Sequence, residues 1–303
     1  MILFPNGSVA VRAIRPPSRG RSRGVGRAAE RATVPPPFIP IGAEPSGMER
    51  VTHDGRETAY RRFDRGGDGP TVCFVHGSGG TKDVWKSQAR LADRFPGVAV
   101  DLSGHGASDD VATPAGPETL DAYADDVVAV AEATDAAALC GNSLGGAVAL
   151  RIALEHDLAL DGLVLAGTGA KLAVAEPLRD ALATDFDRAV SLLHEPDRLF
   201  RDAPAEYVEL SAAAMRACGR AVTERDFLTC HRFDVRDRLG EVQVPALAVV
   251  GARDGLTPPA YHEYLATEIP AGEWTEIPDA AHLAMLERPA AFNEALAAFL
   301  GRL

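Results

Sequence analysis

From Met48 onward, short runs of apolar residues alternate with longer stretches in which apolar residues recur every three or four positions. The short runs predict buried strands, and the longer stretches predict amphipathic helices. This alternation is typical of an α/β fold, with a mostly parallel central sheet flanked by helices. We expect strands at 49–53, 57–64, 71–75, 97–101, 136–140, 162–166, 246–250 and 274–277, and helices near 83–95, 120–133, 144–154, 259–268 and 290–300.

The alternation stops between residues 170 and 240, where no clear strand is found. Helical patterns occur there around 174–194, 204–217 and 221–231. A helical insertion this long inside a βα series is more typical of a lid than of a connecting loop. We therefore expect a sheet-bearing core at 48–169 and 241–303, with a helical lid at 170–240 inserted between late strands.

Residues 1–47 are rich in Arg and Pro and show no periodicity. They predict a disordered leader, because they offer too little apolar surface to offset the entropy of ordering the chain. The stretch lacks the apolar core of a secretory signal. Two interpretations are open: an Arg-rich tail that binds nucleic acid or an acidic partner, or, as we favour, upstream sequence translated ahead of a true start at Met48.

Charge is distributed unevenly along the 303 residues. The whole chain carries −12, residues 1–45 carry +5, and residues 46–303 therefore carry −17, of which the predicted lid contributes only −2. Such acidity argues against nucleic acid and anionic membranes as partners, and no apolar run approaches the ~20 residues of a membrane-spanning helix. The surplus of Asp and scarcity of Lys suggest adaptation to concentrated salt, with the codon bias of a GC-rich genome as the alternative.

The four cysteines show neither CxxC nor Cys/His metal-ligand spacing. Cys73 and Cys140 lie inside apolar runs and are expected to be small core residues; Cys218 and Cys230 complete the set. This usage fits a reduced, cytoplasmic protein with no metal and no organic cofactor.

A G-x-S-x-G motif occupies Gly141–Gly145, between an apolar strand and a helix rich in Ala and Leu. In that context the small residues permit the sharp turn that exposes a nucleophilic serine, here Ser143. The helix that follows directs backbone N–H groups toward any anion formed there. We expect the N–H of Leu144 to be one oxyanion donor, and the N–H of Ser78, in the glycine-rich loop His76–Gly80, to be the other.

The acid and the histidine are expected to follow the serine along the chain, in the order Ser, Asp, His. Asp254 follows the strand 246–250, in a loop at the edge of the sheet where α/β proteins place their sites. His282 lies between the last strand and the last helix, where its imidazole can reach Ser143 and pair with Asp254. His262 falls within a predicted helix and is expected to be exposed, and Asp279 is expected to cap its local turn.

These motifs, in this order, resemble the α/β-hydrolase fold family, and the resemblance covers roughly residues 49–303. The segment Asp101–Ser108 is similar to the D-x-x-G-x-G-x-S turn of that family. The resemblance implies that Asp101, His105 and Ser108 are structural. A serine nucleophile makes haloalkane dehalogenase or epoxide hydrolase chemistry improbable.

The chemistry predicted is acyl transfer, with a small-molecule ester or related carbonyl compound as substrate and a monomer or homodimer as the working form. Carbon–carbon bond hydrolases of ring-cleavage products and enol-lactone hydrolases have similar elbows and stay open as alternatives. A further alternative is an inactive receptor of the same fold. Arg216, Arg220 and Arg225 are candidates for a substrate carboxylate, although we favour the interpretation that they lie on solvated helix faces.

Overall fold

The computed structural model describes residues 48–303, and the predictions for residues 1–47 lie outside the described part of the chain. Met48–Leu303 form one compact unit. Among the residues described, no helix is long and apolar enough to cross a membrane.

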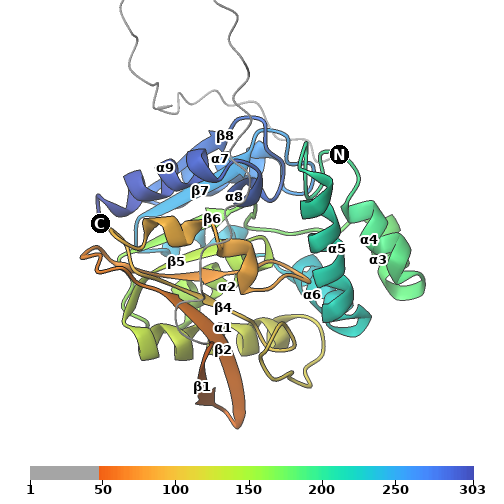
Figure 1. Cartoon of the computed structure of the whole chain (residues 1–303), viewed down its shortest axis with the longest axis horizontal. Helices are drawn as coiled ribbons and strands as arrows, with labels where there is room; N and C mark the ends of the chain where they lie inside the picture. Colours follow the sequence, from red (N-terminus) through yellow and green to blue (C-terminus); the bar gives the residue numbers. More distant parts are fainter. Residues whose placement is uncertain (1–47) are drawn as a thin grey trace, which may run out of the picture. The chain divides into compact units, whose positions relative to one another are not determined.

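An eight-stranded sheet in the order β1-β2-β4-β3-β5-β6-β7-β8 runs through the unit (Figure 1). The β1–β2 and β2–β4 pairs are antiparallel and the other pairs are parallel. This confirms the predicted fold class of a mostly parallel sheet flanked by helices. The strands are β1 Glu49–His53, β2 Arg56–Phe63, β3 Thr71–Val75, β4 Gly97–Val100, β5 Ala136–Asn142, β6 Gly162–Ala166, β7 Ala246–Gly251 and β8 Gly272–Ile277.

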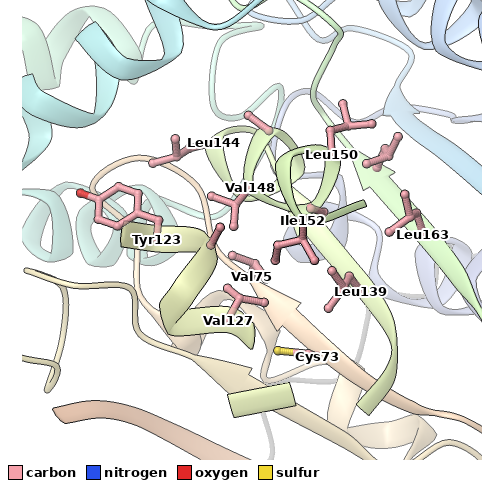
Figure 2. Close-up of a cluster of buried hydrophobic side chains, with 14 of the residues drawn as sticks. Cys73, Val75, Tyr123, Val127, Leu139, Leu144, Val148, Leu150, Ile152 and Leu163 are labelled. Carbon is pink, nitrogen blue, oxygen red and sulfur yellow. The ribbon is translucent and has the colours of Figure 1, made fainter. Parts of the chain in front are cut away.

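The core lies on both faces of the sheet, because alternate residues of the central strands point to opposite sides. Cys73 and Leu139 face one side, where α1 (Pro117–Thr134) and α2 (Leu144–Glu155) cover them, as Figure 2 shows. Phe74 and Cys140 face the other side. Both cysteines are fully buried, as predicted for small core residues.

The remaining helices also follow the predicted pattern, except at four places. The helix expected near 83–95 is instead two short 3-10 helices, and the one expected around 174–194 is divided at Asp185 into two helices. A short helix that begins at Ala284 and a 3-10 helix at Arg236–Glu241 were not predicted. α7 Pro259–Glu268 packs on the same face as α1 and α2, because its Leu265 belongs to the same buried cluster. The elements on the other face are η1 Lys82–Trp85, η2 Gln88–Leu91, α8 Ala284–Glu287 and α9 Pro289–Leu300.

The first of these differences has a tertiary cause. Asp101, at the end of β4, accepts hydrogen bonds from the backbone N–H and the ammonium group of Lys82. Gln88 donates to Asn293 of α9 at 2.8 Å. These long-range contacts fix the first residue of each 3-10 helix and leave the stretch as separate turns, which local helix propensity does not reveal.

Four helices and a 3-10 helix form the segment between β6 and β7, and Figure 1 shows α3 to α6 together at one end of the sheet. The two ends of the segment meet, because Lys171 forms a β-bridge with Asp234 and its ammonium group lies 2.8 Å from that carboxylate. We call residues 170–240 the inserted segment; its elements are α3 Glu176–Thr184, α4 Phe186–Leu193, α5 Ala205–Cys218, α6 Arg220–Arg232 and η3 Arg236–Glu241.

Candidate active site

Ser143 lies in the turn between β5 and α2, with φ 55° and ψ −114°. A non-glycine residue at positive φ is strained and persists only where its surroundings hold it. Here Ser143 N–H donates to the carbonyl of Ala166 at 2.9 Å, and Thr168 Oγ1 donates to the carbonyl of Ser143 at 2.8 Å. The strained turn is therefore fixed by the end of β6.

The small residues of the motif are required by close packing. A side chain on Gly145 would collide with the backbone at the end of β3, and one on Gly141 would collide with the first turn of α2. The turn can thus be this tight only with glycine at both positions, which is the geometry that the sequence predicts for a nucleophile elbow.

The structure brings Asp254 and His282 together from loops that follow β7 and β8. His282 Nδ1 lies 2.8 Å from Asp254 Oδ2. The other carboxylate oxygen accepts the N–H groups of Leu256 and Thr257, each at 2.8 Å, and Thr257 Oγ1 donates to Oδ2 at 2.8 Å. Burial alone would raise the pKa of Asp254, but attraction to His282 and these hydrogen bonds outweigh burial and lower the pKa.

The side chain of Asn142 connects the elbow to the His282 loop. Asn142, directly before Ser143, donates from its amide to the carbonyls of Ala166 at 3.2 Å and of His282 at 3.4 Å. Within residues 48–303, Ser143 Oγ and His282 Nε2 have no hydrogen-bond partner. The predicted link between these two atoms is therefore not closed in this structure, and such links commonly tighten only when substrate binds.

The His76–Gly80 loop lies beside the serine. A Cβ atom on Gly77 would come within 3.1 Å of Ser143 Cβ. Among the described residues the Ser78 N–H has no acceptor, and Leu144, as the first residue of α2, has no acceptor for its N–H inside the helix. Both predicted oxyanion donors are thus unengaged next to the nucleophile.

His76 holds this loop from the sheet side. The N–H of Leu102 donates to His76 Nε2 at 3.1 Å, which leaves Nδ1 to donate to the carbonyl of Gly77 at 2.8 Å. Burial, followed by the nearby charge of His105, lowers the pKa of His76 to about 4. The neutral ring with its proton on Nδ1 satisfies both contacts.

The Asp101–Ser108 turn makes internal contacts of the kind its resemblance implies. Asp101 Oδ2 accepts the N–H of Ala107 at 3.0 Å, and Ser108 Oγ donates to the carbonyl of Asp101 at 2.6 Å. His105 is fully enclosed, with Nε2 at 2.9 Å from Asp226 of α6. The turn therefore joins β4 to the inserted segment.

The expectation that His262 is exposed is wrong. The side chain is fully buried against the sheet, and Nε2 accepts the N–H of Thr168 at 3.0 Å. Burial lowers its pKa to about 4. Because Thr168 in turn donates to the carbonyl of Ser143, His262 supports the elbow from behind. Its spacing of three from buried Leu265 is the sequence signal for this inward face.

Asp279 does not cap its turn within the described residues. Its side chain is largely exposed and lies 3.9 Å from Arg201 Nε, while its backbone adopts φ 55°. The turn is shaped by that backbone conformation, which Asp tolerates better than most residues.

The three arginines considered for a substrate carboxylate already have protein partners. Arg216 Nε donates to Asp187 at 2.9 Å, and Arg220 donates to the carbonyl of Ala183. Both side chains are half exposed, as a solvated face predicts. Arg225 differs, since only 12% of its side chain is exposed and it donates to Asp110 at 2.6 Å.

Two residues of the site were missed by sequence reasoning. Thr257 stabilises Asp254, and only its position three residues after that aspartate, typical of a side chain closing an Asx-type turn, could have indicated it. No such local pattern indicates the role of Asp226 in α6, because its partners His105 and Tyr123 lie far away in the chain. Within residues 48–303, no three His, Cys, Asp or Glu side chains cluster as metal ligands would.

Comparison with known proteins places this chain in a family. A model of the alpha/beta hydrolase family matches residues 74–295. A 3-oxoadipate enol-lactonase of Acinetobacter baylyi is 27% identical over 78% of this chain and 90% of the relative. A pimeloyl-[acyl-carrier protein] methyl ester esterase of Neisseria meningitidis is 30% identical over 73% of this chain and 90% of the relative.

A solved structure of a thermophilic esterase superposes with a TM-score of 0.75 at 31% identity, covering 84% of this chain and 98% of that one. The family model spans more than two thirds of the sequence and includes the elbow, both candidate acid and base loops, and the inserted segment. The chain belongs to the alpha/beta hydrolase family and is a hydrolase.

Proposed function

We propose that the protein hydrolyses small carboxylic esters through an acyl-enzyme formed on Ser143. The observation that carries this proposal is the strained Ser143 turn beside a buried Asp254–His282 pair whose Nδ1–Oδ2 distance is 2.8 Å. A positioned serine, a base and an orienting carboxylate are together the requirements for nucleophilic acyl transfer.

In this mechanism Ser143 Oγ attacks the carbonyl carbon of the ester while His282 Nε2 takes the hydroxyl proton. Asp254 keeps the His282 proton on Nδ1 and stabilises the imidazolium that forms. The imidazolium then protonates the departing alcohol. Water, activated by the same nitrogen, releases the acid and frees Ser143.

The negative charge of the tetrahedral intermediate falls on the former carbonyl oxygen. The N–H groups of Ser78 and Leu144 are the donors we assign to that oxygen, because both are unengaged and both adjoin Ser143. One such donor contributes ~3 kcal/mol to the transition state.

We assign the inserted segment the role of a lid. Its helix α6 contacts the His76–Gly80 loop, since Gly79 N–H donates to Asp226 Oδ2 at 3.0 Å. From α5, Met215 packs against the same glycine. A substrate at Ser143 would therefore be enclosed by residues of this segment.

Substrate charge is constrained by the arginines. Arg216, Arg220 and Arg225 are all engaged by protein acceptors, which favours a neutral ester over a dicarboxylate ring-cleavage product. An enol-lactone or another lactone is the second candidate, because a relative at 27% identity bears the name of an enol-lactonase. The same acyl-enzyme chemistry opens a lactone ring, whereas hydrolysis of a carbon–carbon bond is the less favoured alternative.

The test is a substrate panel of p-nitrophenyl acyl esters, lactones and ring-cleavage diketones, measured at low and at molar salt. We expect the highest kcat/KM on short neutral esters, slower turnover of lactones, and no activity on diketones. Ser143→Ala should abolish ester turnover while its thermal unfolding matches the wild type. Preferred turnover of a diketone, or ester turnover that survives Ser143→Ala, would contradict the proposal.

A further inference from the structure

A second buried carboxylate lies next to the candidate oxyanion loop but outside the Ser143–Asp254–His282 set. Asp226, in the middle of α6, is fully buried. Its Oδ2 accepts the N–H of Gly79 at 3.0 Å and lies 2.9 Å from His105 Nε2. Its Oδ1 accepts the hydroxyl of Tyr123 at 2.7 Å. One carboxylate of the inserted segment thus joins three parts of the core.

The hydrogen bonds of His105 determine its protonation. Nδ1 lies 3.1 Å from the carbonyl of Ser103, and Nε2 faces the Asp226 carboxylate. Neither partner can donate a proton once Asp226 is ionised, so both ring nitrogens must carry hydrogen. His105 is therefore an imidazolium, and with Asp226 it forms a buried ion pair between the inserted segment and the turn after β4.

The aromatic partner completes the enclosure. Tyr123 belongs to the buried cluster covered by α1 and α2, and Figure 2 shows its hydroxyl at the edge of that cluster, pointing away from the other labelled side chains. Its ring centroid lies 6.0 Å from that of His105. The ion pair is therefore shielded from water. In such a buried site a charge-assisted hydrogen bond is strong, and the loss of one partner is costly.

Gly79 is held by this pair, and Gly77 is held by His76 from the opposite side. Ser78 lies between these two anchored residues, and its N–H has no acceptor among the described residues. The Ser78 N–H lies in the Gly77–Ser78 peptide plane, whose carbonyl accepts hydrogen bonds from His76 Nδ1 and from the Gly80 N–H. The Ser78–Gly79 plane, on the other side of the Ser78 Cα, is held by Asp226 through the Gly79 N–H. Asp226 therefore restricts the rotation of Ser78 from the side that His76 does not hold.

We propose that Asp226, paired with the His105 imidazolium, is a positioning residue that aims the Ser78 N–H at the oxyanion. The proposal rests on the proposed function, because it needs an oxyanion to form at Ser143. It assigns the inserted segment a part in transition-state stabilisation in addition to covering the substrate.

The first test compares two changes at this position. Asp226→Ala removes the acceptor of Gly79 N–H, and we expect kcat to fall about 100-fold with KM within about twofold, approaching the loss of one oxyanion donor. Asp226→Asn keeps the shape of the carboxylate but removes its charge, and we expect kcat to fall about 10-fold. Glu224→Gln is the matched control, because Glu224 is on the same helix and its carboxylate lies 3.6 Å from Arg220 Nε, away from the His76–Gly80 loop contacts.

A readout specific for the oxyanion separates positioning from folding damage. We measure each variant on an ester and on its thionoester, whose sulfur is a larger and weaker acceptor for fixed N–H donors. The wild type and Glu224→Gln should strongly prefer the ester, and in Asp226→Ala that preference should shrink by about 10-fold or more. A lower kcat with an unchanged ester preference would overturn the proposal, since it would indicate a general structural effect.

If Asp226→Ala does not fold, a measurement on the wild type still tests the His105–Asp226 ion pair. Nitrogen-15 NMR of labelled histidine should show His105 doubly protonated at pH 8, where an exposed histidine is neutral. A neutral His105 at that pH would overturn the ion pair. Inactivity of the wild type on every ester would instead contradict the proposed function, so the two failures are distinguishable.

Discussion

Two regions of the molecule contain a buried aspartate beside a histidine, and they differ in what the second ring nitrogen meets. At the edge of β7 and β8, His282 Nδ1 lies 2.8 Å from Asp254, and Nε2 has no partner within residues 48–303. Between α6 and the turn after β4, His105 Nε2 lies 2.9 Å from Asp226, and Nδ1 faces a carbonyl. The first ring has a nitrogen available for proton transfer, whereas the second has none.

The comparison teaches that an Asp–His pair is not by itself a catalytic device. Burial and charge are similar in the two regions, but only His282 can take up and release a proton without breaking a protein hydrogen bond. His105 has both ring nitrogens engaged, so it serves as a fixed, charged support at neutral pH. The following predictions test this distinction, from the largest expected effect to the smallest.

Loss of the two histidines should separate the regions most clearly. His282→Ala should lower kcat by about 10⁶-fold, because the base is removed. His105→Gln retains a donor for Asp226 and should lower kcat only about 10-fold through a less firmly held loop. Steady-state kinetics on one ester measure both. Equal losses in the two variants would show that the regions do not differ in role.

Replacement of the carboxylates should repeat the contrast at a smaller scale. Asp254→Asn places an amide beside Nδ1 and favours the unproductive tautomer of His282, so we expect kcat to fall about 10⁴-fold. For Asp226→Asn we expect kcat to fall only about 10-fold, because the amide keeps the shape of the carboxylate and loses only its charge. Pre-steady-state measurement of acylation makes the comparison. If Asp254→Asn retained more than a tenth of wild-type turnover, the acid would be misassigned.

The charged state of His105 should be visible in the pH dependence of stability. Burial opposes its charge, but Asp226 outweighs burial and raises the pKa well above the ordinary value. A histidine whose pKa is higher in the folded state than in the unfolded state, near 6.5, stabilises the fold when it is protonated. That stabilisation is complete below the unfolded pKa and is lost as the pH rises through the folded pKa. The wild-type free energy of unfolding should therefore fall from pH 6 to pH 10 relative to His105→Gln.

Urea unfolding at intervals across that range measures the difference, in which titrating groups remote from His105 cancel. Each unit by which the pKa is raised corresponds to about 1.4 kcal/mol. The groups that face His105 are Asp226 from α6, Tyr123 from α1, Cys218 from α5 and His76 after β3. Parallel stability curves for the two proteins would contradict a charged His105.

The smallest effect is expected at Thr257, which stabilises Asp254 without touching the reacting atoms. Thr257→Val removes the hydroxyl that donates to Asp254 Oδ2 but leaves the backbone N–H that donates to Oδ1. We expect stability to fall by about 1 kcal/mol and kcat to fall about fivefold. Thermal unfolding and ester kinetics check the two numbers. No change in either would show that the hydroxyl is dispensable.

Much of the fold was predictable because its signals are local. The apolar runs of β3 and β6 and the Pro-initiated helix α7 have the predicted bounds, since strand burial and helix starts are encoded in neighbouring residues. The helix expected near 83–95 was not found because Asp101 and Asn293, distant in the chain, fix that stretch.

The candidate site follows the same division. The glycines around Ser143, the loop of Asp254 and the loop of His282 can each be recognised from a few neighbouring residues. The pairing of Asp226 with His105 spans 121 residues and leaves no local pattern beyond an aspartate on an otherwise uncharged helix face. His262 was misplaced for a related reason, because its buried partner Thr168 lies 94 residues away.

The central claim, a nucleophilic Ser143, is tested most directly by covalent labelling with a fluorophosphonate. Our account predicts one adduct per chain, located by peptide mass analysis at Ser143, formed in Asp226→Asn more slowly than in the wild type, and absent from Ser143→Ala. A wild-type protein that stays unlabelled, or an adduct on another residue, would contradict it.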